Sequence, residues 1–294
     1  MPFQHFKLDT DGDGIALVTW DSPGRSMNVI DLEVIKELSA IVEQVASDTA
    51  IKGAVITSGK EAFSAGADLT LLEGLGRLFA EFAQSKGPEA AATALFEESR
   101  KLSLLYRRLE TCGKPWAAAI NGTALGGGFE LTLACHHRVA AQNAKTRLGL
   151  PETKVGLFPG AGGTTRVARM MPPGDTLQFL LKGDQLRVER AKAIKLVDAV
   201  VPAAELVKAA KDWVKQNPKA KAPWDQDGYR LPGGGVYSKA GMQIFPVANA
   251  YYRRDSYDNY PAHRAIMQVV YEGLLVPFDV ALRIESRWLA KISR

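Results

Sequence analysis

A glutamate in an apolar loop is the first residue whose type and setting could do chemistry. Glu152 lies in the run Leu150-Pro-Glu-Thr-Lys-Val-Gly-Leu-Phe-Pro159, among apolar residues, proline and glycine. Burial there would disfavour the charged carboxylate and raise its pKa, as a proton-transfer group working near neutral pH requires. The alternative is a surface glutamate that accepts a hydrogen bond from its own loop.

Two small-residue loops could bind developing negative charge. The run Asn121-Gly-Thr-Ala-Leu-Gly-Gly-Gly-Phe-Glu130 places three glycines at the start of a helix predicted over 127–135. Free N–H groups at a helix start carry positive potential, and glycines let an oxygen atom approach them. The run Phe63-Ser-Ala-Gly-Ala-Asp-Leu69 is the second loop, and its small side chains leave the backbone accessible. The alternatives are a helix–sheet packing contact and a tight turn.

Several other motifs fail on their spacing. The glycine run does not match a dinucleotide fingerprint, and Gly160–Thr164 lacks the Gly-Lys-Ser/Thr of a phosphate loop. His136-His137 lie next to each other on a predicted strand, so they point to opposite faces, and no third ligand predicts a metal site. Cys112 and Cys135 are interpreted as packing residues. Ser64 lacks the leading glycine of a G-x-S-x-G nucleophile motif.

Composition narrows the class of protein. The chain has 294 residues, of which 46% are hydrophobic and 23% charged, enough for a large domain with a buried pocket. A net charge of +5 fits either a phosphate-bearing ligand or simple solubility. We find no basic and aromatic pattern typical of nucleic-acid binding, no signal peptide and no apolar run of about 18 residues, so no membrane span is expected. Two cysteines without a disulfide pattern favour a cytoplasmic protein.

Local patterns predict alternating strands and helices, which indicates an α/β architecture. Strands are expected in a hairpin over Phe6–Trp20 and at 52–57, 115–120, 137–141 and 197–201. Helices are expected after the cap Asp31, over 69–110 with interruptions at Gly74, Gly76 and Gly87-Pro88, over 203–215, and from Tyr260 onward with a break at Pro277. The stretch 217–235, rich in proline and glycine, is expected to be irregular.

Three motifs, taken together, resemble the crotonase (enoyl-CoA hydratase/isomerase) superfamily. They are FSAGADL, NGTALGGGFEL and GLPETKVGLFPGAGGT, in this order, and the match covers residues 1–202. The resemblance implies an α/β fold, a crotonase-like spiral of ββα repeats over 1–202, with a helical C-terminal extension or linker region over 203–294.

The resemblance extends to a particular group of proteins. The 22-residue step from Glu130 to Glu152 resembles that in the N-terminal hydratase part of multifunctional fatty-acid oxidation α-subunits. The segment 259–262 and the helix after it resemble the segment that links hydratase to dehydrogenase in those subunits. The chain ends at Ile292-Ser-Arg without a C-cap signal, so a piece of a longer polypeptide and an ordinary C-terminus both stay open.

Residue roles follow from the resemblance. The backbone N–H groups of Ala67 and Gly127 would form an oxyanion hole, Glu130 would deprotonate the attacking water, and Glu152 would give a proton to the α-carbon. The coenzyme A and substrate path would be lined by Arg25, Met27, Ala65, Asp68, Leu69 and Gly126. For Asp68, a helix cap is an equal alternative.

The activity implied by the resemblance is that of a lyase, an enoyl-CoA hydratase that adds water syn across trans-2-enoyl-CoA in fatty-acid β-oxidation. The alternatives are a Δ3–Δ2-enoyl-CoA isomerase, or other crotonase chemistry, and a non-enzymatic acyl-CoA-binding or scaffolding module. No cofactor is expected beyond the coenzyme A of the substrate, because no NAD fingerprint is present. Expected partners are the acyl-CoA thioester and either further copies of the chain or a thiolase-type subunit.

Overall fold

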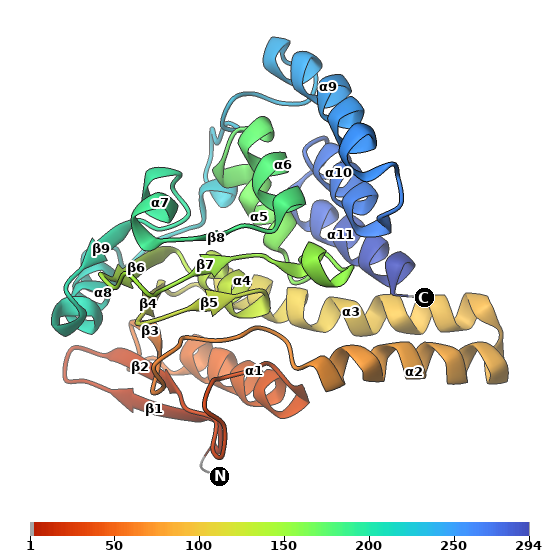
Figure 1. Cartoon of the computed structure of the whole chain (residues 1–294). Helices are drawn as coiled ribbons and strands as arrows, with labels where there is room; N and C mark the ends of the chain where they lie inside the picture. Colours follow the sequence, from red (N-terminus) through yellow and green to blue (C-terminus); the bar gives the residue numbers. More distant parts are fainter. Residues whose placement is uncertain (1–2, 294) are drawn as a thin grey trace. The chain divides into compact units, whose positions relative to one another are not determined.

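The computed structural model describes residues 3–293, which form two compact units (Figure 1). Seven side chains within this range are not described: Leu69, Leu71, Leu72, Leu75, Leu78, Tyr251 and Asp255. Within the described residues, unit 1 consists of 3–68, 105–149 and 185–226, and unit 2 of 69–104, 150–184 and 227–293. Each unit is therefore assembled from three separate stretches of the chain.

A six-stranded sheet forms the centre of unit 1. Its strands, in spatial order, are β1 (Phe6–Thr10), β2 (Ile15–Trp20), β3 (Gly53–Ser58), β4 (Trp116–Ile120), β6 (His137–Ala141) and β9 (Ala199–Val201). The predicted hairpin is confirmed, since β1 and β2 pair in antiparallel fashion, whereas the other neighbours are parallel. All five residues of β4 are buried, as is usual for a strand in the middle of a parallel sheet.

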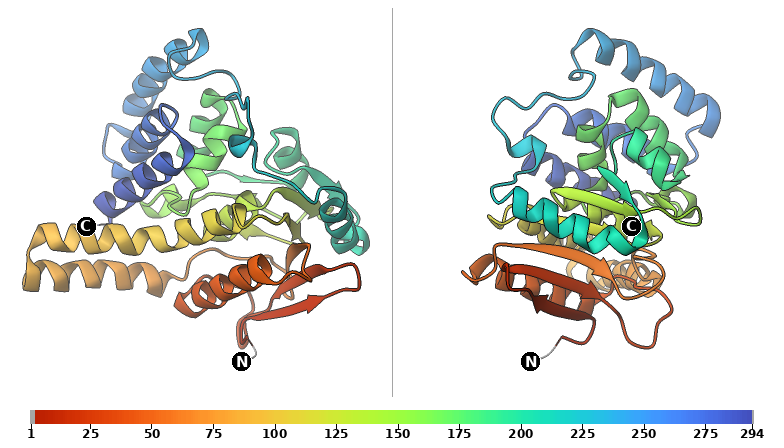
Figure 2. Two further views of the ribbon diagram at one scale, coloured as in Figure 1. Left: turned by 180° about the vertical axis from the view of Figure 1, so that it is seen from behind. Right: turned by 90° about the vertical axis from the view of Figure 1, so that its left-hand side faces the viewer.

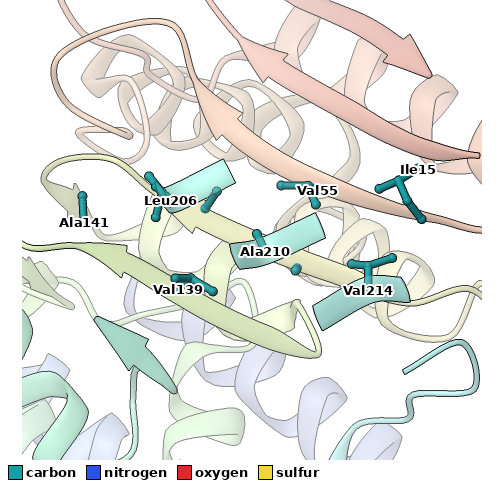
Figure 3. Packing of buried hydrophobic residues seen from close by; sticks show 9 residues of the cluster. Ile15, Val55, Val139, Ala141, Leu206, Ala210 and Val214 are labelled. Carbon is teal, nitrogen blue, oxygen red and sulfur yellow. The ribbon is translucent and has the colours of Figure 1, made fainter. Parts of the chain in front are cut away.

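Helix α8 (Leu206–Gln216) covers one face of this sheet (Figure 3). Leu206, Ala210 and Val214 of the helix pack against buried residues of β2, β3, β4 and β6 in one apolar cluster. These residues recur every four positions and therefore share one helix face. The helix lies beyond the predicted boundary at residue 202, and that boundary stays a prediction.

Short elements complete unit 1. Helix α1 (Leu32–Ser47) begins after Asp31, whose carboxylate accepts a hydrogen bond from Val34 N at 2.9 Å, which confirms the predicted cap. A three-stranded sheet has the order β5-β7-β8. The remaining elements are β5 (Ala124–Leu125), β7 (Leu148–Gly149), β8 (Gln185–Leu186), α4 (Gly127–Ala134), α7 (Val188–Ala193), η2 (Ala203–Glu205) and η3 (Pro223–Asp225).

Unit 2 is helical. Its elements are α2 (Leu69–Lys86), the part of α3 (Pro88–Glu110) up to Leu104, η1 (Glu152–Val155), α5 (Gly163–Met170), α6 (Pro173–Lys182), α9 (Lys239–Ser256), α10 (Pro261–Gly273) and α11 (Phe278–Ile292). The predicted break at Pro277 is confirmed, because it separates α10 from α11. In the part of the chain described, no helix is both long enough and apolar enough to cross a bilayer.

Two helical predictions were wrong or incomplete. Helix α2 continues through Gly74 and Gly76, and the chain turns only at Gly87, where φ is +87° (Figure 2). A glycine inside a helix costs only about 1 kcal/mol, which the rest of an 18-residue helix can offset. Helix α9 has no counterpart among the predicted elements, although it packs against α6.

Candidate functional site

A buried asparagine holds the first small-residue loop in place. The Asn28 side chain donates from Nδ2 to the carbonyls of Trp20 at 2.9 Å and Phe63 at 3.1 Å, and it accepts from Ser22 N at 3.0 Å. The Ser64 hydroxyl donates to the Asn28 carbonyl and accepts from Gly66 N, both at 3.1 Å. Ser64 is fully buried and engaged by the backbone, so its role is to shape the loop.

This loop presents the Ala67 amide. Gly66 has φ of +98°, a conformation that glycine adopts without strain. The flanking groups are paired, since the Gly66 carbonyl accepts from Ile30 N and Asp68 N donates to the Ile30 carbonyl, both at 2.9 Å. Across residues 3–293 no hydrogen bond is recorded from the Ala67 N–H. The Ala67 N–H is therefore a candidate donor for a ligand.

The second loop presents the Gly127 amide at the start of α4. Gly126 (φ +53°) donates its N–H to the Gly149 carbonyl at 3.0 Å and accepts from Phe129 and Glu130. Gly127 is the first residue of the helix, where an N–H has no partner within the helix. No bond from this N–H is recorded in the described part of the chain. The Gly127 carbonyl accepts from Tyr106 Oη at 2.9 Å, which fixes the peptide.

The two loops are packed against each other within unit 1. A β-carbon placed on Gly66 would lie 3.5 Å from Gly127 N and 3.0 Å from the Leu125 carbonyl. One placed on Gly128 would lie 2.4 Å from Ser64 Cβ, so only glycine fits there. Ser64 and Ala124 also form a parallel β-bridge. Two N–H donors on neighbouring loops are the arrangement that binds an oxyanion.

Glu130 lies on the helix that begins at Gly127. It is in the first turn of α4, three residues after Gly127, and only 3% exposed. A buried carboxylate at a helix N-terminus is stabilised in its charged form by the helix dipole. Ala67, Gly126, Gly127 and Glu130 all belong to unit 1.

Glu152 belongs to unit 2, where its carboxyl group is buried. It opens η1, and its Oε2 atom is inaccessible to solvent and has no hydrogen-bond partner among the described residues. Burial raises the pKa of Glu152 to about 8, and the charge of Glu285 acts in the same direction. A carboxyl group with this pKa is protonated at neutral pH and can give up a proton.

The residues predicted to contact coenzyme A have mixed surroundings. The Arg25 guanidinium pairs with Asp68 at 2.7 Å and lies 3.4 Å from Asp31, and 41% of its side chain is exposed. Met27 is 45% exposed and Ala65 is half-buried. Asp68 immediately precedes α2, so the cap alternative also stays open. The predicted contact of Leu69 falls on a side chain outside those described.

A second buried carboxylate, Glu285 of α11, was missed by the sequence analysis. It is fully buried and accepts hydrogen bonds from Gly162 N at 2.5 Å, Thr165 N at 2.9 Å, Thr165 Oγ1 at 2.8 Å and Thr164 Oγ1. The available signal was a glutamate on the same helical face as Leu282 and Leu289. Charged residues are almost never fully buried without a partner, so the burial of Glu285 depends on these hydrogen bonds.

The histidine pair has structural contacts. His136 Nδ1 accepts from Trp116 N at 3.0 Å, and the ring of His137 stacks on Trp213 with centroids 4.5 Å apart. Burial lowers the pKa of both rings. No group of three or more His, Cys, Asp or Glu residues suited to a metal ion occurs within the described residues.

The fold and the site define a class, and the comparisons identify the family. The parallel sheet, the glycine loop before α4 and the helical C-terminal region are those of the crotonase fold. The enoyl-CoA hydratase/isomerase family matches residues 10–223, and the chain belongs to that family. An enoyl-CoA hydratase from Bacillus anthracis has 25% identity and a TM-score of 0.61, over 92% of this chain and 91% of that one.

Curated relatives narrow the comparison further. The fatty acid oxidation complex subunit alpha of Shewanella amazonensis is 34% identical over 96% of this chain, and that of Shewanella loihica is 36% identical over 96%. The chain spans only 38% of the length of each, and it corresponds to their N-terminal hydratase part.

Proposed function

We propose that the protein is an enoyl-CoA hydratase that adds water across the double bond of a 2-enoyl-CoA thioester. The observation that carries the proposal is the pair of amides at Ala67 and Gly127, on loops packed against each other and without recorded partners in the described chain. As water attacks a conjugated thioester, negative charge moves to the carbonyl oxygen. Each donor aimed at that oxygen contributes about 3–4 kcal/mol to the transition state.

Two carboxyl groups complete the proposed reaction. Glu130 accepts a proton from water while the water oxygen bonds to the β-carbon. Glu152 gives its proton to the α-carbon as the charge returns from the thioester oxygen, so that the product is a 3-hydroxyacyl-CoA. Each proton transfer by a positioned group contributes about 10²–10⁴-fold in rate.

The chain itself supports a joint role for the two glutamates. Gly149 accepts a hydrogen bond from Gly126, the residue before the proposed donor Gly127. Glu152 follows Gly149 by three residues, and three extended residues span about 10 Å. Chain connectivity thus limits the separation of the Glu152 and Gly149 backbones to about 10 Å, which is compatible with the proposed joint role.

The test is a hydration assay of trans-2-enoyl-CoA thioesters of several chain lengths, with Glu130→Gln and Glu152→Gln beside the parent. We expect each variant to lose at least about 10²-fold in kcat and to retain acyl-CoA binding, because each removes one proton-transfer group. Glu33→Gln, on the exposed surface of α1, is a matched control that should retain parent activity. Near-parent turnover of either site variant would contradict its role.

Isomerisation of a 3-enoyl-CoA is the second candidate reaction. The family that the chain matches includes isomerases, and in that reaction an ionised glutamate would take a proton from the α-carbon and, once protonated, return it to the γ-carbon. Comparing the conversion of 2-enoyl-CoA with that of 3-enoyl-CoA in one assay separates the two. Tight acyl-CoA binding without either conversion would favour the binding or scaffolding alternative.

The setting of the activity is part of the proposal. The relatives are named as subunits of a fatty acid oxidation complex, which supports a cytoplasmic role in β-oxidation. A partner subunit of thiolase type, or further copies of this chain, would complete such an assembly. The proposed steps use side chains and backbone alone, so the coenzyme A of the substrate is the sole cofactor moiety they require.

A further inference from the structure

Helix α11 presses along the segment that follows Glu152 in unit 2. A β-carbon on Gly160 would lie 2.2 Å from Leu289 Cδ2, and one on Gly162 would lie 3.1 Å from Leu282 Cδ2. Between these leucines on the same helical face lies Glu285, whose carboxylate accepts from residues 162, 164 and 165. One face of α11 therefore holds the segment 160–165 by shape and by charge.

The donors around Glu285 favour its ionised form. Two of them are backbone N–H groups, which can only donate, and two are threonine hydroxyls. Burial raises the pKa of Glu285, and these four hydrogen bonds act in the opposite direction. Glu152 has the reverse surroundings, because its buried Oε2 has no recorded partner in the described chain. When two buried carboxyl groups interact, the charge settles on the one with more donors.

Residues 152–165, which connect Glu152 to the residues bonded by Glu285, are held by a hydrogen bond and by buried side chains. The Glu152 carbonyl accepts from Leu157 N at 3.0 Å and closes the turn of η1. Phe158 and Ala161 are buried. The α5 end of the segment is fixed by Glu285, so the position of Glu152 is coupled to that of α11.

From this arrangement we propose that Glu285 is a positioning residue for the reaction: through the segment 160–165 it orients Glu152, and its buried negative charge keeps Glu152 in the proton-donating form. The inference rests on the proposed function for its effect on rate. Glu285 acts through this segment and through its charge, without touching the substrate or the reacting atoms.

Charged and polar groups lie on the elements that pack against α11. Helix α5 contributes Arg166 and Arg169, both buried, and Glu285 acts on the pKa of Arg169. Arg166 Nη1 bonds to the Ala161 carbonyl at 3.3 Å, and Arg169 Nη2 to the Gly273 carbonyl at 2.8 Å. Among the described residues, Glu272 of α10 pairs with Arg287 of α11, and Ser99 of α3 donates to the Ser286 carbonyl at 3.3 Å. The positive charge of Arg169 offsets part of the buried charge of Glu285.

The decisive variant is Glu285→Gln, which keeps the shape and removes the charge. We expect the pKa of Glu152 to fall by about half a unit to one unit, because the repulsion that opposes its ionisation is gone. The alkaline limb of kcat against pH should move down by the same amount. Above the limb this corresponds to about a three- to tenfold loss of rate. The KM should change less than about twofold.

Matched controls separate positioning from a general loss of packing. Glu272→Gln removes another glutamate, from the neighbouring helix α10, and should leave the pH profile unchanged. Glu285→Asp keeps the charge and should keep the alkaline limb near its parent position. If Glu285→Gln fails to fold, Thr165→Val removes one hydroxyl donor to the carboxylate, and Thr165→Ser retains it. The alkaline limb of kcat against pH should then shift in Thr165→Val and keep its parent position in Thr165→Ser.

A direct titration distinguishes failure of this inference from failure of the proposed function. The ¹³C carboxyl resonance of Glu152, assigned with Glu152→Gln, reports its pKa in protein of any activity. An unchanged Glu152 titration in Glu285→Gln would overturn the inference even where the parent hydrates 2-enoyl-CoA. A parent that fails to hydrate 2-enoyl-CoA would overturn the proposed function, and a shifted titration would still support the electrostatic link.

Discussion

The two units of the protein provide their proposed reacting groups by different means. In unit 1, neutral backbone amides at Ala67 and Gly127 are exposed by glycine geometry and by bonds from Asn28 and Ser64. In unit 2, the proposed proton donor Glu152 is buried, and we propose that it depends on Glu285, whose hydrogen-bonded partner Gly162 is 123 residues away in sequence. Amide donors need only local shape, whereas a proton donor needs a balance of charge from the whole unit. Substitutions in the two units should therefore have different effects.

Removing the Gly127 donor should have the largest effect and should act on rate alone. Gly127→Pro deletes the N–H, and proline is well tolerated at the first position of a helix, so α4 should persist. We expect kcat for 2-enoyl-CoA hydration to fall by about 10²–10³-fold. Circular dichroism and acyl-CoA binding serve as controls for the fold. A Gly127→Pro protein with parent activity would show that this N–H is unused.

In unit 2, the burial of Glu152 should instead make the free energy of unfolding depend on pH. The pKa of Glu152 is about 8 in the folded protein against an ordinary value of 4.5, so the protonated form is the one that folding favours. The stabilising contribution is complete below pH 4.5 and is lost as the pH rises through 8, at up to about 1.4 kcal/mol per pH unit.

Glu152→Gln should lack this dependence. Its free energy of unfolding, measured with denaturant, should rise relative to the parent between pH 5 and about pH 8. Glu33→Gln, which changes an exposed glutamate, gives the comparison. Parallel pH profiles for Glu152→Gln and the parent would mean that Glu152 titrates normally.

Because the two loops in unit 1 pack closely, a side chain added at Gly128 should lower the free energy of unfolding, and a smaller residue at position 64 should reduce that loss. Gly128→Ala places a β-carbon 2.4 Å from Ser64 Cβ, and we expect a loss of about 1–3 kcal/mol in the free energy of unfolding. In a Ser64→Gly background the same change should cost less. Equal costs in both backgrounds would mean that the loops move apart freely.

The smallest effect is expected at Arg25. It lies between two carboxylates, those of Asp31 and Asp68, so its charge is already largely balanced and can add little attraction for a phosphate. We expect Arg25→Ala to raise the KM for acyl-CoA by only a few-fold, and Asp68→Asn to lower it slightly. A tenfold or larger rise in KM for Arg25→Ala would identify this residue as a principal phosphate ligand.

The sequence predicted the local features of unit 1 well. The hairpin, the Asp31 cap and the start of the helix at Gly127 each depend on residues close together in the chain. The two glycine loops were also found, because a backbone donor must be exposed by a short run of small residues. Their contact through Gly66 and Gly128 needed the structure.

Features that depend on tertiary packing were not predicted. Helix α9 contains Pro246 and has a weak apolar pattern, so its packing against α6 stabilises what local propensity does not. Its one local signal was Ser238, which accepts from Gly241 N at 3.1 Å as an N-cap. Glu285 could not be linked to Glu152 from the sequence, since the link passes through α11 and the segment 160–165.

Helix α2 has two glycines at which substitution should increase its stability. The positions of Gly74 and Gly76 have no heavy atom within 4 Å of an added methyl group, among the atoms described. Alanine would fit at both and would favour the helical conformation by about 1 kcal/mol at each. Among the atoms described, no steric constraint requires glycine at these two positions, although glycine makes the helix less stable than alanine would. An engineer who wanted a more heat-tolerant version of the protein could begin with these two positions and leave every proposed reacting group untouched.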